Sequence, residues 1–320
     1  MSKQINDQSA PRLSPRRKKG FFYTIRKYWP FYIMLIPMLV YLAVFCYLPM
    51  GGVVMAFQNF RPVRGFFRSE WVGWENFQDI FSDDLFWEKL RNTVIISVTK
   101  IIFSAPAPVI LALLLNEVKN KVFKRVVQTI VYLPKFVSWV VVATIVKALL
   151  DIQDGPINTL LVNLGIFESP QLLMGSKPLF RPLLVITDVW KGVGWGSIVY
   201  LAAMTSINPT YYDAAELDGA NRFQKMWYIT LPCLKPTFMI LLILSMGSIL
   251  SAGFDQIYVM ENSVVMEVGD IIDTYVYRKG LIDQDYSYAA AVGLFKSVVS
   301  IFLVGGANWL ANKTGNESLF

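Results

Sequence analysis

Residues 208–236 carry the sequence NPTYYDAAELDGANRFQKMWYITLPCLKP and join two long apolar runs. Asn208, followed by proline, is a good N-cap for a helix that begins there. Gly219 can end that helix, because glycine readily adopts the left-handed conformation of a helix C-terminus. Asn221 can cap a second helix, which we expect the prolines from Pro232 onward to end. The stretch therefore predicts two short, polar helices at a tight bend.

The chain around this stretch is strongly apolar. Hydrophobic residues make up 54% of it and charged residues 17%, whereas a soluble domain has nearer a quarter charged residues. A helix needs about 20 mostly apolar residues to cross a bilayer. Six runs qualify: 31–57, 93–115, 126–150, 183–206, 237–260 and 289–311. We therefore predict an all-α polytopic membrane protein, with one domain of six transmembrane helices over residues 21–320.

The distribution of charge predicts the orientation of these helices. With both termini in the cytoplasm, the cytoplasmic segments contain 16 basic and 6 acidic residues, and the outer segments 9 basic and 15 acidic. Lysine and arginine concentrate on the cytoplasmic side of membrane proteins, so this orientation is the favoured one. Residues 1–20 are polar and basic, and we expect a disordered cytoplasmic tail there. The 208–236 bend then faces the cytoplasm.

Several classes of function are disfavoured by composition. The chain has no histidine, which removes the usual general base and the Ser-His and Cys-His dyads. Its two cysteines, Cys46 and Cys233, form no disulfide or metal-binding pattern. The net charge of +7 gathers beside the apolar runs, as expected of a membrane protein and not of a nucleic-acid-binding one. We expect no catalytic site, metal or cofactor in this chain.

The cytoplasmic bend resembles the EAA loop of ABC importer permeases. In that family the loop reads Glu-Ala-Ala, three residues, Gly, nine residues, Ile, one residue, Leu-Pro. Here Asp213 replaces the glutamate, and every other motif position matches at the same spacing. The residues that we assign to this ATPase-coupling loop, at about 207–236, are Tyr212, Asp213, Ala214, Ala215, Asp218, Gly219, Ala220, Ile229, Leu231 and Pro232.

Further motifs extend the resemblance over nearly all of the chain after residue 20. Gly155-Pro156-Ile157-Asn158 and Gly253-Phe254-Asp255-Gln256-Ile257-Tyr258 are similar to segments of the carbohydrate, maltose-type branch, and in particular of Gram-positive complex-oligosaccharide permeases. The resemblance implies a type I importer fold in a bacterial cell membrane. It also implies a second, usually different permease chain, two copies of a cytoplasmic ABC ATPase and an extracellular solute-binding protein.

ATP hydrolysis is assigned by this resemblance to the partner. The chain lacks the Gly-x-x-x-x-Gly-Lys-Ser/Thr loop that cradles phosphates, so ATP and Mg²⁺ are expected on the ATPase subunits. This chain is therefore expected not to be an enzyme. Its expected ligands are an oligosaccharide and the surrounding membrane lipid.

Charged and aromatic residues within the runs are candidates for the substrate pathway, because ionisable groups at membrane depth are costly and often functional. The set is Lys100, Lys135, Asp188, Trp190, Lys191, Trp195, Phe254, Asp255, Gln256 and Lys296. Structural roles compete with this interpretation. Asp188 and Lys191 are three residues apart and could pair on one helical face, and the tryptophans could form an aromatic belt at the interface.

The substrate remains open at this point. The charges within the runs sum to a positive value, which suggests an acidic sugar such as a uronate oligosaccharide. A permease of the same type for a non-sugar solute is an alternative. An ion-coupled secondary transporter predicts two related halves with broken helices, and no internal repeat is found. A membrane enzyme is disfavoured by the lack of a clustered catalytic set.

Overall fold

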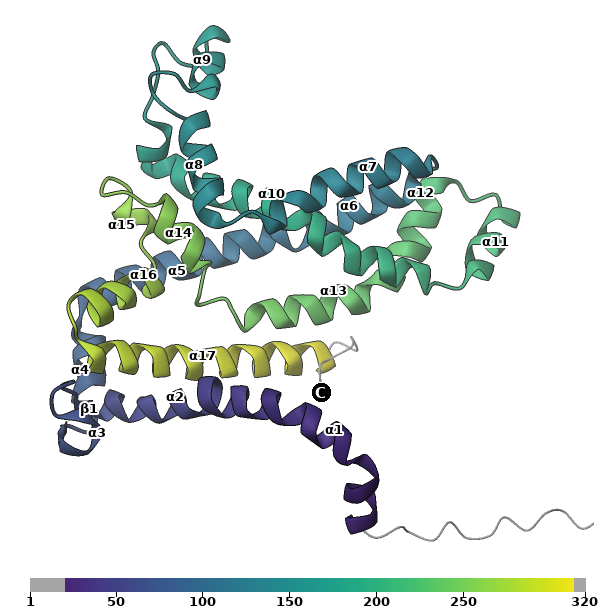
Figure 1. Cartoon of the computed structure of the whole chain (residues 1–320). Coiled ribbons are helices and arrows are strands. Elements are labelled where there is room, and N and C mark those ends of the chain that lie inside the picture. Colours follow the sequence, from purple (N-terminus) through teal and green to yellow (C-terminus); the bar gives the residue numbers. More distant parts are fainter. Residues whose placement is uncertain (1–20, 314–320) are drawn as a thin grey trace, which may run out of the picture. The chain divides into compact units, whose positions relative to one another are not determined.

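The computed structural model describes residues 21–313, which are helical apart from loops and one two-stranded sheet (Figure 1). The chain divides into two compact units, residues 1–52 and residues 53–320. The predicted disordered tail at 1–20 lies outside the described residues.

The described part of the first unit is one continuous helix. Helix α1 (Phe21–Leu42) continues through the π-helical segment η1 (Ala43–Tyr47) into α2 (Leu48–Met50). The amide of Leu48 donates to the carbonyl of Ala43, the i→i+5 bond of a π-helix, just before a proline that has no amide hydrogen. The first predicted span lies within the 32-residue candidate span Arg26–Phe57.

The second unit begins with the 3₁₀ helix η2 (Gly51–Phe57), whose first two residues belong to the first unit. A hairpin follows, in which Gln58 pairs with Trp71 and Asn59 with Glu70. The elements of this hairpin and the next helix are β1 (Gln58–Asn59), α3 (Gly65–Arg68), β2 (Glu70–Trp71) and α4 (Glu75–Ser82).

Helices α5 (Asp84–Ser104) and α6 (Pro106–Glu117) form one candidate span of 34 residues. Asp83 caps α5, because its carboxylate accepts a hydrogen bond from the amide of Leu85 at 2.9 Å. Proline fits the first turn of α6, where its missing N–H is not needed. The second predicted span, 93–115, is therefore confirmed.

The third predicted span, 126–150, is broken. Helix α7 (Lys121–Tyr132) and the 3₁₀ turn η3 (Leu133–Phe136) are bent by 104° from α8 (Trp139–Leu149). Pro134 lies in η3, and Ser138 starts α8 afresh by accepting a hydrogen bond from an amide in its first turn. A proline and a strong N-cap four residues apart thus interrupt one apolar run.

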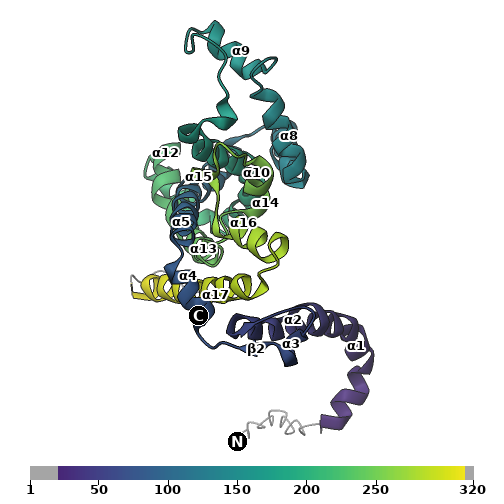
Figure 2. The same ribbon diagram turned by 90° about the vertical axis from the view of Figure 1, so that its left-hand side faces the viewer.

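A short loop segment and a long helix come next. Helix α9 (Pro156–Asn163) follows α8, and both views show it beyond the end of α8 (Figures 1 and 2). The 3₁₀ turn η4 (Leu173–Gly175) leads into α10 (Lys177–Thr205), a helix of 29 residues. The fourth predicted span, 183–206, lies almost wholly within α10.

Four helices in the described residues are long and apolar enough to cross a membrane, or five if the bent pair counts as one span. Helix α10 is long enough, but Asp188, Lys191 and three glycines make it less apolar than the others. The prediction of about six spans is reached only when α10 and the bent pair are both included.

The bend at 208–236 forms as two short helices, α11 (Pro209–Leu217) and α12 (Arg222–Lys225). However, Pro232 does not end the second one. The course continues through the π-helical η5 (Met226–Thr230) into α13 (Leu231–Met246). The amide of Leu231 bonds to the carbonyl of Met226, so the π-turn accommodates the proline, and the predicted helix end at Pro232 is wrong.

The fifth predicted span, 237–260, is also discontinuous. Helix α13 ends at Met246, and α14 starts only at Phe254 after Ala252 and Gly253, which have φ of +48° and +85°. Left-handed residues cannot continue a right-handed helix. The remaining elements are α14 (Phe254–Met260), α15 (Met266–Gly269), α16 (Ile272–Tyr277), η6 (Arg278–Ile282) and α17 (Tyr286–Lys313).

Three buried clusters hold the second unit together. One packs α5 and α8 against α10 and α14 around Phe180 and Ile257. Another joins α4, α5, α16 and α17 around Phe86 and Ile272. The third joins α6, α10 and α13 around Tyr200. Helices α5 and α10 each take part in two clusters, so they are the central elements that position the site.

Candidate functional site

Helix α11 is closed at both ends by local hydrogen bonds. The side chain of Asn208 accepts from the amide of Thr210 at 3.0 Å. At the other end the amide of Ala220 bonds to the carbonyl of Ala215 at 2.8 Å, and that of Gly219 to Glu216 at 3.1 Å. Gly219 has φ of +76°. These bonds form a Schellman motif, which confirms the glycine-terminated bend predicted from the sequence.

One face of α11 is uncovered in the described chain. Tyr211 is 56% exposed and Leu217 is 91% exposed, and Ala214 lies between them on the same side. The opposite face packs on the stem formed by α12 and η5, where the hydroxyl of Tyr212 lies 2.9 Å from that of Thr230. An apolar, small-residue face held on a fixed stem is suited to enter a groove of another protein.

The predicted loop residues differ in their exposure. Exposed members are Asp213, Ala214, Asp218, Gly219 and Pro232, and half-buried members are Tyr212, Ala215, Ala220, Ile229 and Leu231. An ion pair between Lys225 and Glu216, at 2.7 Å, also bridges α12 and α11. The hydrogen bond from Lys225, with its positive charge, lowers the pKa of the Glu216 carboxyl.

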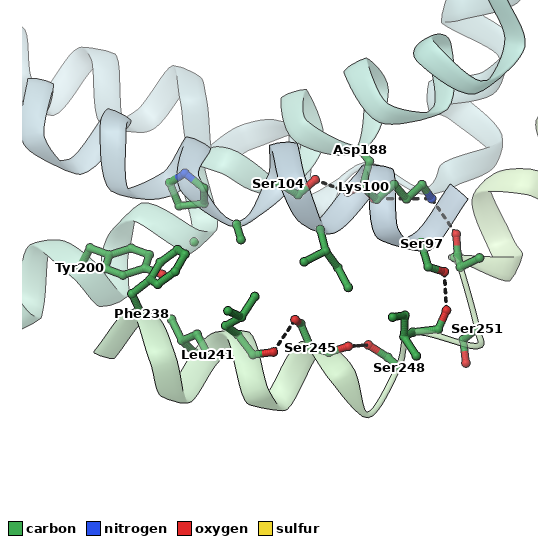
Figure 3. A pocket seen from close by; sticks show the side chains of 18 residues that line it. Ser97, Lys100, Ser104, Asp188, Tyr200, Phe238, Leu241, Ser245, Ser248 and Ser251 are labelled. Carbon is green, nitrogen blue, oxygen red and sulfur yellow. Dashed lines mark hydrogen bonds and ion pairs between the residues drawn. The ribbon is translucent and has the colours of Figure 1, made fainter. Parts of the chain in front are cut away.

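A cavity of about 470 Å³ lies among α5, α6, α10 and α13 (Figure 3). Its polar lining consists mainly of serine hydroxyls with one lysine and one carboxylate. The lining residues labelled in Figure 3 are Ser97, Lys100, Ser104, Asp188, Tyr200, Phe238, Leu241, Ser245, Ser248 and Ser251.

The break between α13 and α14 forms one wall of this cavity, and polar side chains from α5 satisfy its backbone. The hydroxyl of Ser97 donates to the carbonyl of Ile249, and the amine of Lys100 donates to that of Ala252 at 2.7 Å. Irregular backbone at membrane depth is tolerated where such partners exist or where it lines a cavity. Here both conditions hold.

Lys100 is the centre of the polar network. Its amine also donates to the side chain of Gln256 and lies 3.9 Å from Asp188. Asp188 accepts from Ser104 at 2.8 Å. Gln256 in turn donates to Thr187 at 2.7 Å. The network joins α5, α10 and the start of α14, so the cavity walls are held in a fixed relation.

Of the ten pathway candidates, Lys100 and Asp188 line the cavity, and Gln256 reaches it through Lys100. The proposed Asp188–Lys191 pair is wrong. The amine of Lys191 instead donates to three carbonyls at the bend after α7, those of Pro134, Lys135 and Val137, at 2.6–3.2 Å. The carbonyl of Pro134 also accepts from the amide of Val137 at 3.2 Å. The lysine therefore adds donors at a bend where the regular helical bonding is interrupted.

The other candidates do not line this cavity. Lys296 forms an ion pair with Asp273, while Lys135 and Asp255 are exposed. Among the aromatic candidates, Trp190 is exposed, Trp195 packs edge-on against Phe136, and Phe254 stacks on Tyr258 with ring centroids 5.4 Å apart.

Sequence reasoning missed the serines, Tyr200 and Phe238. A signal was present for the serines, because Ser245, Ser248 and Ser251 recur at intervals of three within an otherwise apolar run. That spacing places hydroxyls along one side of a helix. Ser245 and Ser248 donate to carbonyls of their own chain, which leaves their oxygens able to accept a further hydrogen bond.

The fold and site therefore define a helical membrane protein with a cavity between its helices, in which serine hydroxyls, Lys100 and Asp188 lie among apolar side chains. An exposed helical bend is connected to the cavity walls. Residues 104–316 match the family described as binding-protein-dependent transport system inner membrane component. The chain belongs to this family, which confirms the predicted resemblance to ABC importer permeases. The ion-coupled transporter and membrane-enzyme alternatives receive no support.

Two curated relatives from Bacillus subtilis (strain 168) align over most of the chain. Protein LplB is 47% identical over 290 residues, covering 90% of each chain. The polygalacturonan/rhamnogalacturonan transport system permease protein YteP is 43% identical over 289 residues, covering 90% of this chain and 89% of its own.

Two solved structures are also similar. One is a bacterial ABC transporter involved in the import of the acidic polysaccharide alginate, with a TM-score of 0.83 and 38% identity over 91% of this chain and 98% of that one. The other is a bacterial alginate ABC transporter in complex with an alginate pentasaccharide-bound periplasmic protein. It has a TM-score of 0.85 and 36% identity over 94% of this chain and all of that one.

Proposed function

We propose that this chain forms part of the membrane pathway of an ATP-driven importer and that α11 docks on a separate ATPase. One observation carries the proposal. Helix α11 lies between two elements that both line the cavity, α10 through Asp188 and Tyr200, and α13 through Phe238 and Ser245. A displacement of α11 is therefore transmitted directly to two cavity walls.

The connection to α13 is suited to transmitting force. Helix α12, η5 and α13 form one candidate span, Arg222–Met246, without an interrupting loop. From α11, Tyr212 bonds to Thr230 of η5, and Glu216 bonds to Lys225 of α12. Closure of an ATPase pair around α11 would thus move the start of α13, while the α13–α14 break lets its far end change angle relative to α14.

The proposed substrate is an acidic oligosaccharide. The permease YteP is named for polygalacturonan and rhamnogalacturonan, and both structural neighbours for alginate. In this chain, serine hydroxyls suit the hydroxyl groups of a sugar. Lys100 is the basic side chain of the lining and lies 3.9 Å from Asp188 in the same cavity. A permease of the same type for a non-sugar solute is the alternative.

The proposed assembly contains a second permease chain, two cytoplasmic ATPase subunits and an external solute-binding protein. The relatives' family name and the periplasmic protein in one neighbouring structure support such partners. ATP and Mg²⁺ would be held by the ATPase subunits. In the proposed orientation both termini and α11 face the cytoplasm, as the distribution of basic residues favours.

Uptake of a matched pair of sugars tests the substrate. The complete assembly would be reconstituted in vesicles, and ATP-dependent uptake of an oligogalacturonate would be compared with that of its methyl ester, which has the same chain length and no charge. Faster uptake of the charged form supports the proposal. Preference for the ester rejects the acidic substrate, and uptake of neither sugar by an assembly that hydrolyses ATP favours the non-sugar alternative.

A further inference from the structure

The hairpin of residues 58–71 has an unusual surface that the transport proposal does not use. It carries three arginines, Arg61, Arg64 and Arg68, and all three are exposed. No acidic residue occurs between Gln58 and Ser69. Within residues 21–313 none of the three arginines forms an ion pair. The hairpin therefore carries a net positive charge. Its one acidic residue, Glu70 in β2, forms no ion pair with the arginines within residues 21–313.

Large apolar side chains are exposed among these arginines. Val63 and Phe67 are 99% and 102% exposed, which means that the rest of the chain covers essentially none of either side chain. Trp71 and Trp74 are 63% and 66% exposed. Leaving such side chains in water is unfavourable. Tryptophan and arginine together are typical of the interface between lipid and water.

Hydrogen bonds hold the hairpin in shape, so its exposed surface is a defined feature. The side chain of Gln58 donates to the carbonyl of Phe66 at 3.0 Å, and the hydroxyl of Ser69 donates to that of Gly65 at 2.7 Å. Phe57 and Trp71 stack with ring centroids 5.7 Å apart. The side chains at the tip are thus presented by a structured scaffold.

The hairpin is also connected to the ends of two candidate spans. It directly follows the span Arg26–Phe57 in the sequence. The amide of Phe60 donates to the hydroxyl of Ser287 at 2.8 Å, and Ser287 is in the first turn of the last span. The hairpin is therefore attached to the ends of two candidate spans.

We propose that this hairpin binds anionic phospholipid headgroups, with the arginines contacting phosphates and Val63 and Phe67 entering the apolar boundary of the leaflet. Charge complementarity and the position at two span ends favour lipid as the occupant. An acidic sugar on its transport path is less well supported, because no hairpin residue lines the cavity. Each basic residue near an anionic surface strengthens binding about fivefold.

Site-specific lipid quenching tests the proposal on the full-length chain. Cys46 and Cys233 are replaced with alanine, and a bimane label is attached at Val63→Cys, whose side chain makes no packing contact to lose. Two nanodisc samples contain the same mixture of phosphatidylglycerol and phosphatidylcholine, and only the brominated species differs. The ratio of quenching by the two lipids then reports local enrichment of the anionic one. A label at Glu168→Cys, in an exposed loop on the same side, is the matched control.

We expect several-fold stronger quenching by brominated phosphatidylglycerol at position 63 and a ratio near one at position 168. Changing Arg61, Arg64 and Arg68 to glutamine should bring the first ratio to one. In the labelled chain that keeps its three arginines, high salt should also weaken the preference for phosphatidylglycerol. The test therefore does not depend on folding of the triple variant. A quenching ratio of one at position 63 overturns the proposal, and this is the result expected if a protein or sugar occupies the hairpin. A preference for phosphatidylglycerol that survives both the arginine changes and high salt also overturns it.

Discussion

The amine of Lys100 in α5 lies 2.7 Å from the carbonyl oxygen of Ala252, the residue that directly precedes the left-handed Gly253 at the break between α13 and α14. A charged side chain at membrane depth therefore completes the hydrogen bonding of an interrupted helix. The same contact fixes one wall of the cavity. The roles of Lys100 in stability and in the pathway are consequently difficult to separate except by matched variants.

The first prediction concerns this contact. Lys100→Met keeps the length of the side chain but removes the amine. The carbonyl of Ala252 and the side chain of Gln256 then lose their donor. An unsatisfied buried polar group costs about 1–3 kcal/mol, so the free energy of unfolding should fall by that amount. Thermal unfolding in detergent measures it. Lys147→Met, at an exposed lysine, is the control. Equal stability of the two variants would show that the Lys100 bond does not hold the break.

Two glycines of α10 offer a matched pair. A Cβ on Gly194 would lie 1.9 Å from the carbonyl oxygen of Val131, whereas one on Gly192 would meet nothing within 4 Å. Gly194→Ala should therefore force α10 away from α7 and destabilise the protein by about 1–3 kcal/mol. Gly192→Ala should be neutral or stabilising by up to about 1 kcal/mol, because alanine is the better helix former. Similar unfolding temperatures for both variants would contradict the close approach.

The bend at Gly219 can be tested with substitutions that differ in how well they tolerate a positive φ. No atom lies within 4 Å of a Cβ placed there, but its φ of +76° is unfavourable for most residues. Gly219→Val should strain the Schellman turn and reduce uptake severely, while Gly219→Asn should keep most activity, since asparagine tolerates this conformation. Gly219→Asp is expected to abolish uptake through its added charge on the docking surface. Normal uptake by the valine variant would remove the bend from the coupling mechanism.

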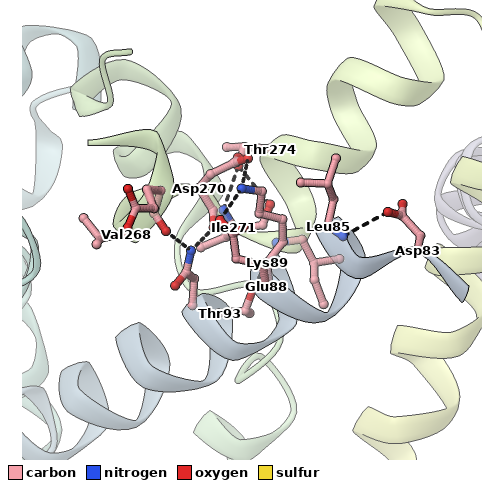
Figure 4. A network of polar contacts seen from close by, with 12 residues as sticks. Asp83, Leu85, Glu88, Lys89, Thr93, Val268, Asp270, Ile271 and Thr274 are labelled. Atoms are coloured by element: carbon pink, nitrogen blue, oxygen red, sulfur yellow. Dashed lines mark hydrogen bonds and ion pairs between the residues drawn. The ribbon is translucent and has the colours of Figure 1, made fainter. Parts of the chain in front are cut away.

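A pH effect is expected from Glu261 in the loop after α14. Burial and the negative charge of Asp270 raise the pKa of Glu261 to about 7, against the opposing effects of Arg278 and Lys89. Asp270 is itself buried and held by Lys89 at 3.4 Å (Figure 4). One carboxylate oxygen of Glu261 is buried without a hydrogen-bond partner in the described residues. The folded state therefore favours the protonated side chain.

The sign of this effect follows from proton linkage. Between pH 4.5 and about 7 the folded protein binds more protons at Glu261 than the unfolded protein does. Stability should accordingly decrease as the pH rises through this window, by at most about 3 kcal/mol. Glu261→Gln should reduce that dependence, as measured by unfolding temperature from pH 5 to 8. An unchanged pH profile in the glutamine variant would exclude Glu261 as its source.

The helical membrane fold could be predicted because its signals are local. Apolar runs, caps and the glycine-terminated bend of α11 each depend on residues close in sequence. The breaks were harder to predict. Pro134 interrupts a span and Pro232 does not, because the outcome depends on whether a π-turn or a distant side chain can satisfy the backbone nearby. The sequence around either proline does not contain that information.

The site was predictable to a lesser extent for the same reason. Lys100 and Asp188 stood out as charges in apolar runs, and both line the cavity. Lys191 stood out equally, yet it bonds to carbonyls 54–57 residues away. Ser97 and Tyr200 reach the cavity through the packing of α5 and α10, which no local pattern indicates.

The most direct test of the account is a cross-link from α11 to the ATPase. In a chain whose native cysteines are replaced with alanine, Leu217→Cys is treated with a thiol-reactive cross-linker in the working complex, and Ser169→Cys in an exposed loop on the other side serves as the control. We expect a product between this chain and the ATPase subunit from position 217 alone, with a yield that changes when ATP is added. A transport-competent complex that gives no such product, or gives it equally from position 169, would contradict the proposed coupling.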